Sequence, residues 1–262
     1  MVSYVRCQRC GRPVCPQCQR PASVGIQCVD CVQDAASRTR APRTVAGARV
    51  RGGQPVVTNT IIGLTVVSFL LQLLIGAPYE QFGYFVPVLG DSEPWRFITT
   101  AFLHVGVWHI VLNMYALYLV GPTLETVLGR ARFITMYVLA AIGGSVAVLL
   151  FADPTGRSWL TPVAGASGAI FGLFGALALT MRRMKRSDSQ ILVIIGINVV
   201  LGFVIQGVSW QGHLGGLVVG SALAAIYLFA PRKQRTLWAV GGSVLMAVVL
   251  VALTVAKYAG VF

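Results

Sequence analysis

The stretch GASGAIFG, residues 165–172, opens a long apolar run and allows two interpretations of Ser167. Small residues four positions apart let membrane helices approach closely, and Gly168 and Gly172 have that spacing. On this interpretation Ser167 is only a small residue in a helix contact. Alternatively, Ser167 is a nucleophile, which requires a neighbouring base and donors for a developing oxyanion. The rest of the sequence must decide between the two.

The composition is that of an integral membrane protein. Of the 262 residues, 56% are hydrophobic and 11% are charged, and the mean hydropathy is +0.74. A soluble domain has about 25% charged residues. A net charge of +13 would suggest a nucleic-acid partner in a soluble chain. Here, however, the 21 Lys and Arg residues fall mainly in the N-terminal segment and in alternate loops. That distribution is typical of membrane orientation, so no nucleic-acid partner is expected.

Seven apolar runs follow residue 55, and each is close to the ~20 residues that a membrane-spanning helix needs. They cover residues 56–77, 97–120, 132–151, 163–181, 190–209, 213–230 and 237–259. Lys and Arg gather before the first run and after the second, fourth and sixth, whereas the opposite loops are mainly acidic or uncharged. The positive-inside rule therefore predicts a multi-pass protein of the cell membrane with a cytoplasmic N-terminus and an external C-terminus.

The three histidines, His104, His109 and His213, lie in or at the edge of these apolar runs. An ionisable side chain in a span is costly and usually functional, although a histidine that only bonds a neighbouring helix is an alternative. His109 and Asn113 are four residues apart and share one helix face. Glycines follow His213 at three and seven positions, so its face allows another helix to approach closely.

Three polar residues fall near the outer ends of three different predicted spans: Ser167, His109 and His213. His213 can serve as the base for a Ser167 nucleophile, and His109 with the Asn113 amide can donate to an oxyanion. A catalytic triad would need a carboxylate beside the histidine. Glu125 lies just past the second run, at its cytoplasmic end, which is too far away. A hydrolase would therefore use a Ser-His dyad and no catalytic cofactor.

The GASGAIFG stretch resembles the G-x-S-G motif of the rhomboid intramembrane serine proteases. The series His104-x4-His109-x3-Asn113 is similar to their H-x4-H-x3-N element. His213 and the glycines after it resemble the histidine and glycines of their sixth helix. The resemblance covers about residues 57–230, with these elements in family order on the proper helices.

For function, the resemblance implies an intramembrane serine endopeptidase that cleaves peptide bonds in or near transmembrane segments of other membrane proteins. Ser167 would attack the scissile carbonyl, and His213 would take and return the proton. His109, Asn113 and the Ser167 backbone N–H would stabilise the oxyanion. Phe171 stands where many members carry a tyrosine that stacks on the histidine, so the ring is kept and its hydroxyl is lost. A non-catalytic rhomboid-like scaffold that binds transmembrane helices and a small-solute transporter remain as alternatives.

All six cysteines lie in three C-x2-C pairs near the N-terminus: a first pair, Cys7 and Cys10, a middle pair, Cys15 and Cys18, and a last pair, Cys28 and Cys31. This pattern indicates thiolates that bind zinc. A disulfide framework would be expected only if this end of the chain were exported. The segment resembles the B-box-like zinc modules found before some bacterial rhomboid domains, which implies regulation, oligomer contacts or docking of a protein partner.

The number of cysteines limits the structural zinc. Two separate tetrahedral sites need eight ligands, and no histidine precedes His104 to complete the set. In a cross-braced module alternate pairs share a metal, so the first and last pairs would bind one zinc and the middle pair would form a half-site. One zinc held by the first and middle pairs is the alternative, with only four residues between those pairs.

Together these features predict an all-α polytopic membrane protein with a rhomboid-like six-helix core, one additional C-terminal transmembrane helix and a small zinc-binding module. The expected parts are the cysteine-rich module at residues 1–34, a flexible basic linker at 35–55, the protease domain at 56–230 and the additional helix with the C-terminus at 231–262. The linker is rich in Arg, Ala, Gly and Pro and lacks apolar periodicity.

Overall fold

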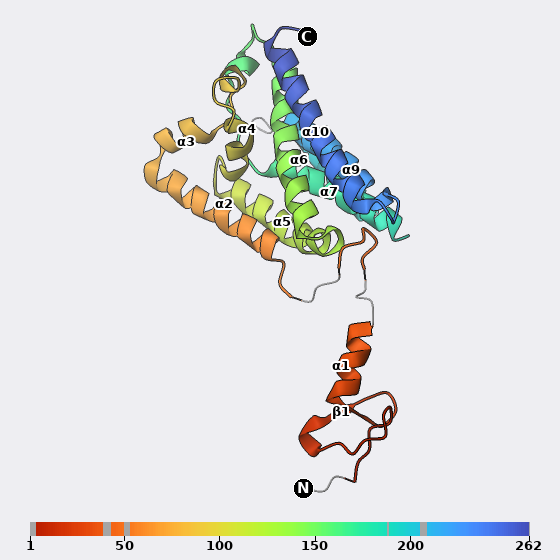
Figure 1. Ribbon diagram of the computed structural model, residues 1–262. Coiled ribbons are helices and arrows are strands. Elements are labelled where there is room, and N and C mark those ends of the chain that lie inside the picture. The colour runs from red at the N-terminus through yellow and green to blue at the C-terminus, as the bar shows by residue number, and fades with distance from the viewer. Residues whose placement is uncertain (1–3, 39–42, 50–52, 188, 205–208, 262) are drawn as a thin grey trace. The chain divides into compact units, whose positions relative to one another are not determined.

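The computed structural model describes residues 4–38, 43–49, 53–187, 189–204 and 209–261 (Figure 1). The chain divides into two compact units, Met1–Pro42 and Arg43–Phe262. The first unit contains the cysteines and the second contains the long apolar helices.

The first unit is a small cysteine-centred fold. Its elements are the 3-10 helix η1, Pro16–Cys18, the strands β1, Gln19–Pro21, and β2, Ile26–Cys28, and the helix α1, Val29–Arg38. The two strands form an antiparallel hairpin, a small exception to the all-helical expectation. Its buried core consists of Cys7, Val14 and Cys28. Because α1 continues to Arg38, the unit extends beyond the predicted boundary at residue 34.

The second unit is entirely helical over its named elements. These are α2 Val56–Ile75, α3 Ala77–Gly83, η2 Pro87–Leu89, α4 Arg96–Thr99, η3 Thr100–Phe102, α5 Val107–Leu128, α6 Arg130–Phe151, η4 Arg157–Leu160, α7 Ser167–Arg183, α8 Ser189–Val204, α9 Trp210–Phe229 and α10 Arg235–Tyr258. Among the described residues, five helices are long and apolar enough to cross a membrane: α2, α5, α6, α9 and α10. The long helices follow the order of the predicted spans, which confirms a polytopic all-α membrane fold.

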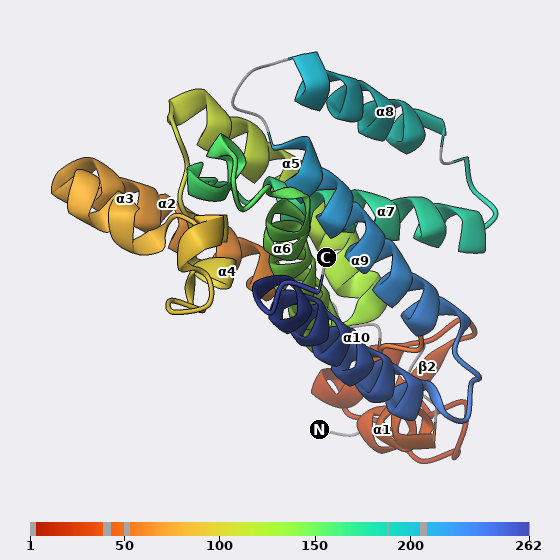
Figure 2. The same ribbon diagram turned by 90° about the horizontal axis from the view of Figure 1, so that it is seen from above.

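Helix α6 forms the centre of this unit. Seen from above, it is surrounded by α5, α7, α9 and α10, with α2 to one side (Figure 2). Its spanning segment is 72% buried, whereas that of α10 is only 11% buried. Helix α10 therefore leaves most of its surface to the lipid and packs by a narrow face.

The second predicted span is wrong at its start. The apolar run predicts it over residues 97–120, but α5 runs from Val107 to Leu128, and residues 96–102 form the short elements α4 and η3. The cause lies at His104, whose backbone groups form hydrogen bonds with a side chain and not with the backbone of a helix. Its N–H donates to Gln72 Oε1 at 3.1 Å, and its C=O accepts from Gln72 Nε2 at 2.8 Å.

Part of the predicted flexible linker is anchored on the second unit. Ala46 is fully buried, and its carbonyl oxygen accepts a 2.7 Å hydrogen bond from Arg132. Thr44 Oγ1 donates to the carbonyl of Val127 at 2.6 Å. Residues 43–49 therefore lie against the ends of α5 and α6.

Glu125 fixes the relative position of α2 and α5. Its buried carboxylate accepts the backbone N–H groups of Val57 and Thr58 at 3.1 and 2.9 Å, and the Thr58 hydroxyl at 2.9 Å. The first N–H groups of a helix have no acceptor within it, and a negative charge is favoured there. Glu125 therefore caps α2 from a neighbouring helix.

Glycines form the contact between α7 and α9. A Cβ added at Gly216 would overlap the backbone of Gly168, and one added at Gly220 would overlap the backbone of Gly172. The two backbones therefore meet without intervening side chains. This confirms the close helix approach that the glycine spacing predicts on both helices.

We predict that Gly216→Ala destabilises the protein by about 2 kcal/mol or more, because its methyl group must push the two backbones apart. Gly241→Ala is the matched control, since Gly241 also lies inside a helix but nothing approaches its Cβ position within 4 Å. Unfolding of both variants by denaturant in detergent micelles measures the difference. Equal stabilities would contradict the assigned contact.

Candidate active site

Ser167 is the first residue of α7 and follows a fixed extended segment. Val163 in that segment exchanges two backbone hydrogen bonds with Phe85, at 3.1 and 2.8 Å. Thr100 then holds both sides of the turn, since its hydroxyl donates to the Val163 carbonyl at 2.6 Å and its carbonyl accepts the Gly165 N–H at 2.9 Å. Gly165 has a φ of +131°, which L side chains rarely adopt. These contacts set the place where the chain turns into the helix.

His109 lies beside Ser167 across Gly165. A Cβ added at Gly165 would lie 2.6 Å from His109 Cε1, 2.8 Å from His109 Nε2 and 3.7 Å from Ser167 Oγ. A side chain at this position would therefore displace the imidazole. Asn113, one turn further along α5, is buried and donates from Nδ2 to the His109 carbonyl at 2.8 Å. The predicted pair therefore occupies the same face of α5 near the serine.

His213 is buried in the first turns of α9, at the level of Ser167. Phe171, one turn after Ser167, stacks on its ring with a centroid distance of 4.2 Å and an interplanar angle of 11°. The neighbours of Ser167 and His213 in the sequence are also in contact. A Cβ added at Gly168 would lie 3.2 Å from the Gly212 carbonyl oxygen. The structure thus brings the α5, α7 and α9 residues of the predicted site together.

The Nδ1 atoms of His109 and His213 are buried and have no hydrogen-bond partner among the described residues. Within that part of the chain, no carboxylate bonds the His213 ring. The arrangement therefore contains a hydroxyl and an imidazole on adjacent helices, without the third residue of a triad.

Sequence reasoning missed one residue of this site, Gln72. Its amide clamps the backbone of His104, which is fully buried. The His104 ring meets His109 edge-on at 4.9 Å, and its Nε2 accepts the Ala166 N–H at 3.4 Å. Gln72 therefore supports the site through His104. The available signal was a glutamine in the apolar run 56–77, where an amide is as costly as a histidine.

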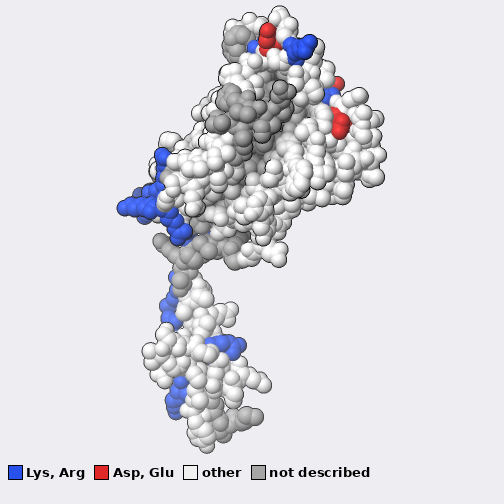
Figure 3. Space-filling model, turned by 180° about the vertical axis from the view of Figure 1, so that it is seen from behind, with Lys and Arg blue, Asp and Glu red and all other residues white. Residues whose placement is uncertain are grey.

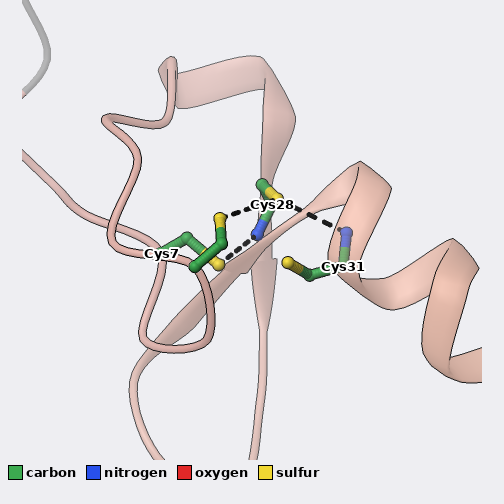
Figure 4. A group of neighbouring side chains, drawn as sticks. Cys7, Cys28 and Cys31 are labelled. Atoms are coloured by element: carbon green, nitrogen blue, oxygen red, sulfur yellow. Dashed lines mark hydrogen bonds between the residues drawn. The ribbon is translucent and has the colours of Figure 1, made fainter.

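The first and last cysteine pairs form a second candidate site, in the N-terminal unit. Their four Sγ atoms all lie within 4.8 Å of one another, and those of Cys10 and Cys28 are 3.8 Å apart. Tetrahedral zinc with bonds of about 2.3 Å places its sulfurs about 3.8 Å apart, so this arrangement fits. Figure 4 shows Cys7, Cys28 and Cys31 converging from a loop, β2 and α1. The middle pair is not part of this group.

The environment of Cys7 favours its thiolate. Burial raises the pKa of the Cys7 thiol, but backbone N–H groups of Cys10, Cys28 and Arg9 lower it, to a net value of about 6. One of these donors, the Cys28 N–H, lies 3.3 Å from Cys7 Sγ. Because the thiolate is the form that binds metal, the lowered pKa favours Cys7 as a ligand. Within the same cluster, hydrogen bonds to Cys28 and Cys10 raise the pKa of Cys31, to about 12.

Comparisons with known proteins agree with this geometry. The family model of the Rhomboid domain matches residues 91–231, more than half of the chain. The chain is 36% identical to "Rhomboid protease GluP" of Bacillus subtilis over 224 residues, covering 81% of this chain and 42% of that protein. It is 34% identical to "RHOMBOID-like protein 6, mitochondrial" of Arabidopsis thaliana over 187 residues, covering 69% and 56%.

A third relative is shorter. The chain is 32% identical to "Putative rhomboid protease YdcA" of Bacillus subtilis over 152 residues, which are 56% of this chain and 73% of that protein. By contrast, the chain spans about half the length of the first two relatives. The domain match, these identities and the helical fold around Ser167 lead to one conclusion: the chain belongs to the rhomboid family.

Proposed function

We propose that the protein is an intramembrane serine protease that hydrolyses peptide bonds in or near transmembrane segments of membrane-protein substrates. The observation that carries the proposal is the stacking of Phe171 on His213, which holds an imidazole beside the first turn of the Ser167 helix. The names of the GluP and YdcA relatives, which describe rhomboid proteases, support the same activity.

In this mechanism His213 is the base. It takes the Ser167 hydroxyl proton while Oγ forms a bond to the scissile carbonyl carbon, and the carbonyl oxygen becomes an oxyanion. When the C–N bond breaks, His213 returns the proton to the leaving amine. Water then attacks the carbonyl carbon of the acyl-enzyme while His213 takes one of its protons. When the bond to Ser167 Oγ breaks, His213 returns the proton to Oγ and the second product leaves. The dyad is thus regenerated without a cofactor.

The oxyanion is stabilised by donors around the first turn of α7. The backbone N–H of Ser167 is one of the first N–H groups of a helix, which lack acceptors within it. His109 adds its imidazole. The Asn113 amide nitrogen carries two hydrogens, and one of them bonds the His109 carbonyl. Within the described part of the chain the second hydrogen has no other acceptor, so it can donate to the oxyanion.

Charge supports the orientation that we propose, with a cytoplasmic N-terminus and an external C-terminus in the cell membrane. On the face drawn in Figure 3, a cluster of Lys and Arg lies at one end of the second unit, whereas the acidic residues lie at the opposite end, beside fewer basic ones. The C-terminal ends of α7 and α9 lie side by side, since Arg183 in the last turn of α7 packs over the Phe229 ring at 5.5 Å. Arg232 and Lys233 follow α9 in the sequence. Under the positive-inside rule this end is cytoplasmic.

We predict that Ser167→Ala and His213→Ala each abolish cleavage of transmembrane substrates by the purified protein. The double variant is no worse than either single variant, because the two residues act as one unit. Rates of product formation with a panel of transmembrane substrates in proteoliposomes provide the measurement. Turnover by Ser167→Ala at the wild-type rate would favour the alternative, a non-catalytic scaffold that binds transmembrane helices.

We predict a smaller loss for Asn113→Ala, about two orders of magnitude in kcat, which corresponds to one oxyanion donor worth ~3 kcal/mol. The loss falls on the chemical step, so KM stays nearly unchanged. Steady-state kinetics separate the two parameters. A normal kcat with a raised KM would instead make Asn113 a substrate contact.

We also propose that the N-terminal unit binds one structural zinc through the first and last cysteine pairs and docks a protein partner. The four clustered thiols support the zinc, which would hold the hairpin and α1 together. A metal here supplies folding free energy and no catalytic step, because the cluster lies outside the unit that contains Ser167.

We predict one zinc per full-length chain. Cys28→Ser lowers the zinc content to near zero, whereas the matched control Cys15→Ser leaves it unchanged, because Cys15 lies outside the cluster. Elemental analysis of the purified proteins counts the metal. Two zinc ions per wild-type chain, or full retention in Cys28→Ser, would refute this ligand assignment. Proteolysis by the wild type should survive removal of the zinc by a chelator.

A further inference from the structure

The last two residues of α10 contact the core of the second unit, although the helix is otherwise mostly exposed. Lys257 is only 9% exposed, and its Nζ donates to the Leu150 carbonyl at 3.2 Å. Leu150 lies in the last turn of α6, where carbonyl groups lack helical partners and a cation is favoured. The C-terminal end of α10 is therefore fastened to the central helix, α6.

Tyr258 reaches two loops at once. Its hydroxyl donates to the Pro87 carbonyl at 2.6 Å, and its ring meets Trp159 edge-on at 5.9 Å. Gly90 leaves room for this contact, because a Cβ added there would overlap the Tyr258 hydroxyl. In Figure 1 the C-terminal end of α10 lies next to the loops at one end of the second unit. Tyr258 thus joins η2 to η4.

These two loops lead directly to the nucleophile. Pro87 is two residues from Phe85, and Trp159 is four residues from Val163. Phe85 and Val163 form the paired backbone hydrogen bonds that fix the extended segment before Ser167. Phe85 is also fully buried against the ring of Phe97, at 4.6 Å between centroids. A contact that closes the two loops therefore limits the movement of the segment that carries Ser167.

We propose that Tyr258 is a positioning residue for Ser167, and that α10 completes the framework of the active site in addition to spanning the membrane. The inference rests on the proposed protease function. The Tyr258 hydroxyl keeps the backbone hydrogen bonds between Phe85 and Val163 in place. Loss of this hydroxyl lets the turn before Ser167 move. A small displacement of a catalytic group lowers the rate of the chemical step far more than it lowers substrate affinity.

The test compares Tyr258→Phe with Tyr227→Phe in the full-length protein. Tyr227 is a matched control, because its hydroxyl also makes a 2.6 Å hydrogen bond to α10, at Ser243. It lies near the far end of α9, 14 residues after His213 (227 minus 213), and so about 21 Å along the helix from the dyad. Both substitutions remove one hydroxyl and keep the ring.

For Tyr258→Phe we expect kcat to fall about fivefold, as for the loss of one hydrogen bond in the positioning framework, with KM unchanged. Hydrogen exchange of the Phe85 and Val163 amides, followed by mass spectrometry, should become faster. Tyr227→Phe should change neither kcat nor this exchange. Equal kcat values for the two variants, or unchanged exchange at Phe85 and Val163, would overturn the inference.

The exchange measurement separates this inference from the protease proposal. If wild-type cleavage does not depend on Ser167, the proposed function fails, whereas exchange at Phe85 and Val163 still reports whether Tyr258 holds the loops. If cleavage depends on Ser167 and Tyr258→Phe leaves both kcat and exchange at wild-type values, the positioning role alone fails.

Discussion

The close backbone contact between α7 and α9 is the constraint on which the rest of the molecule depends. In lipid, burial of apolar side chains gives helices little reason to associate, so tight packing and buried polar contacts must hold them. Glycines on both helices remove the side chains between them, and Gly216 meets the Gly168 backbone directly. Because Ser167 and His213 lie at the start of these two helices, the same contact sets the distance between the proposed nucleophile and the proposed base.

A second constraint is that backbone groups at membrane depth must find partners inside the protein. The chain leaves helical geometry between η3 and α5, which is the region that brings His104 to the site. Side chains replace the missing helix partners: Gln72 bonds both backbone groups of His104, and Arg96 donates to the Tyr84 carbonyl at 2.7 Å. Buried polar residues in the spans thus have two roles: His213 is the proposed base, and Gln72 provides hydrogen-bond partners for the backbone of His104.

The sequence was sufficient where the physical cause is local. Apolar length predicts the long helices, four-residue spacing predicts the glycine contact, and alternate pairing predicts that the first and last cysteine pairs meet. It was insufficient where a distant residue decides. Hydropathy extends the second span back to residue 97, because it does not include contacts between distant residues. Gln72, 32 residues before His104, bonds the backbone of His104 and so ends the helix there. Likewise, composition marks residues 35–55 as linker, yet Ala46 is fully buried.

The orientation of His213 shows how packing can substitute for a hydrogen bond. In a triad a carboxylate bonds the imidazole and fixes its direction. Here His213 Nδ1 has no partner among the described residues, and the ring is held by the face of Phe171. An aromatic pair contributes about 0.5–1.5 kcal/mol beyond its buried area, similar to one net hydrogen bond. Phe171 and the Gly168–Gly212 contact can therefore orient the proposed base by packing, and the stacking does not need a tyrosine hydroxyl at position 171.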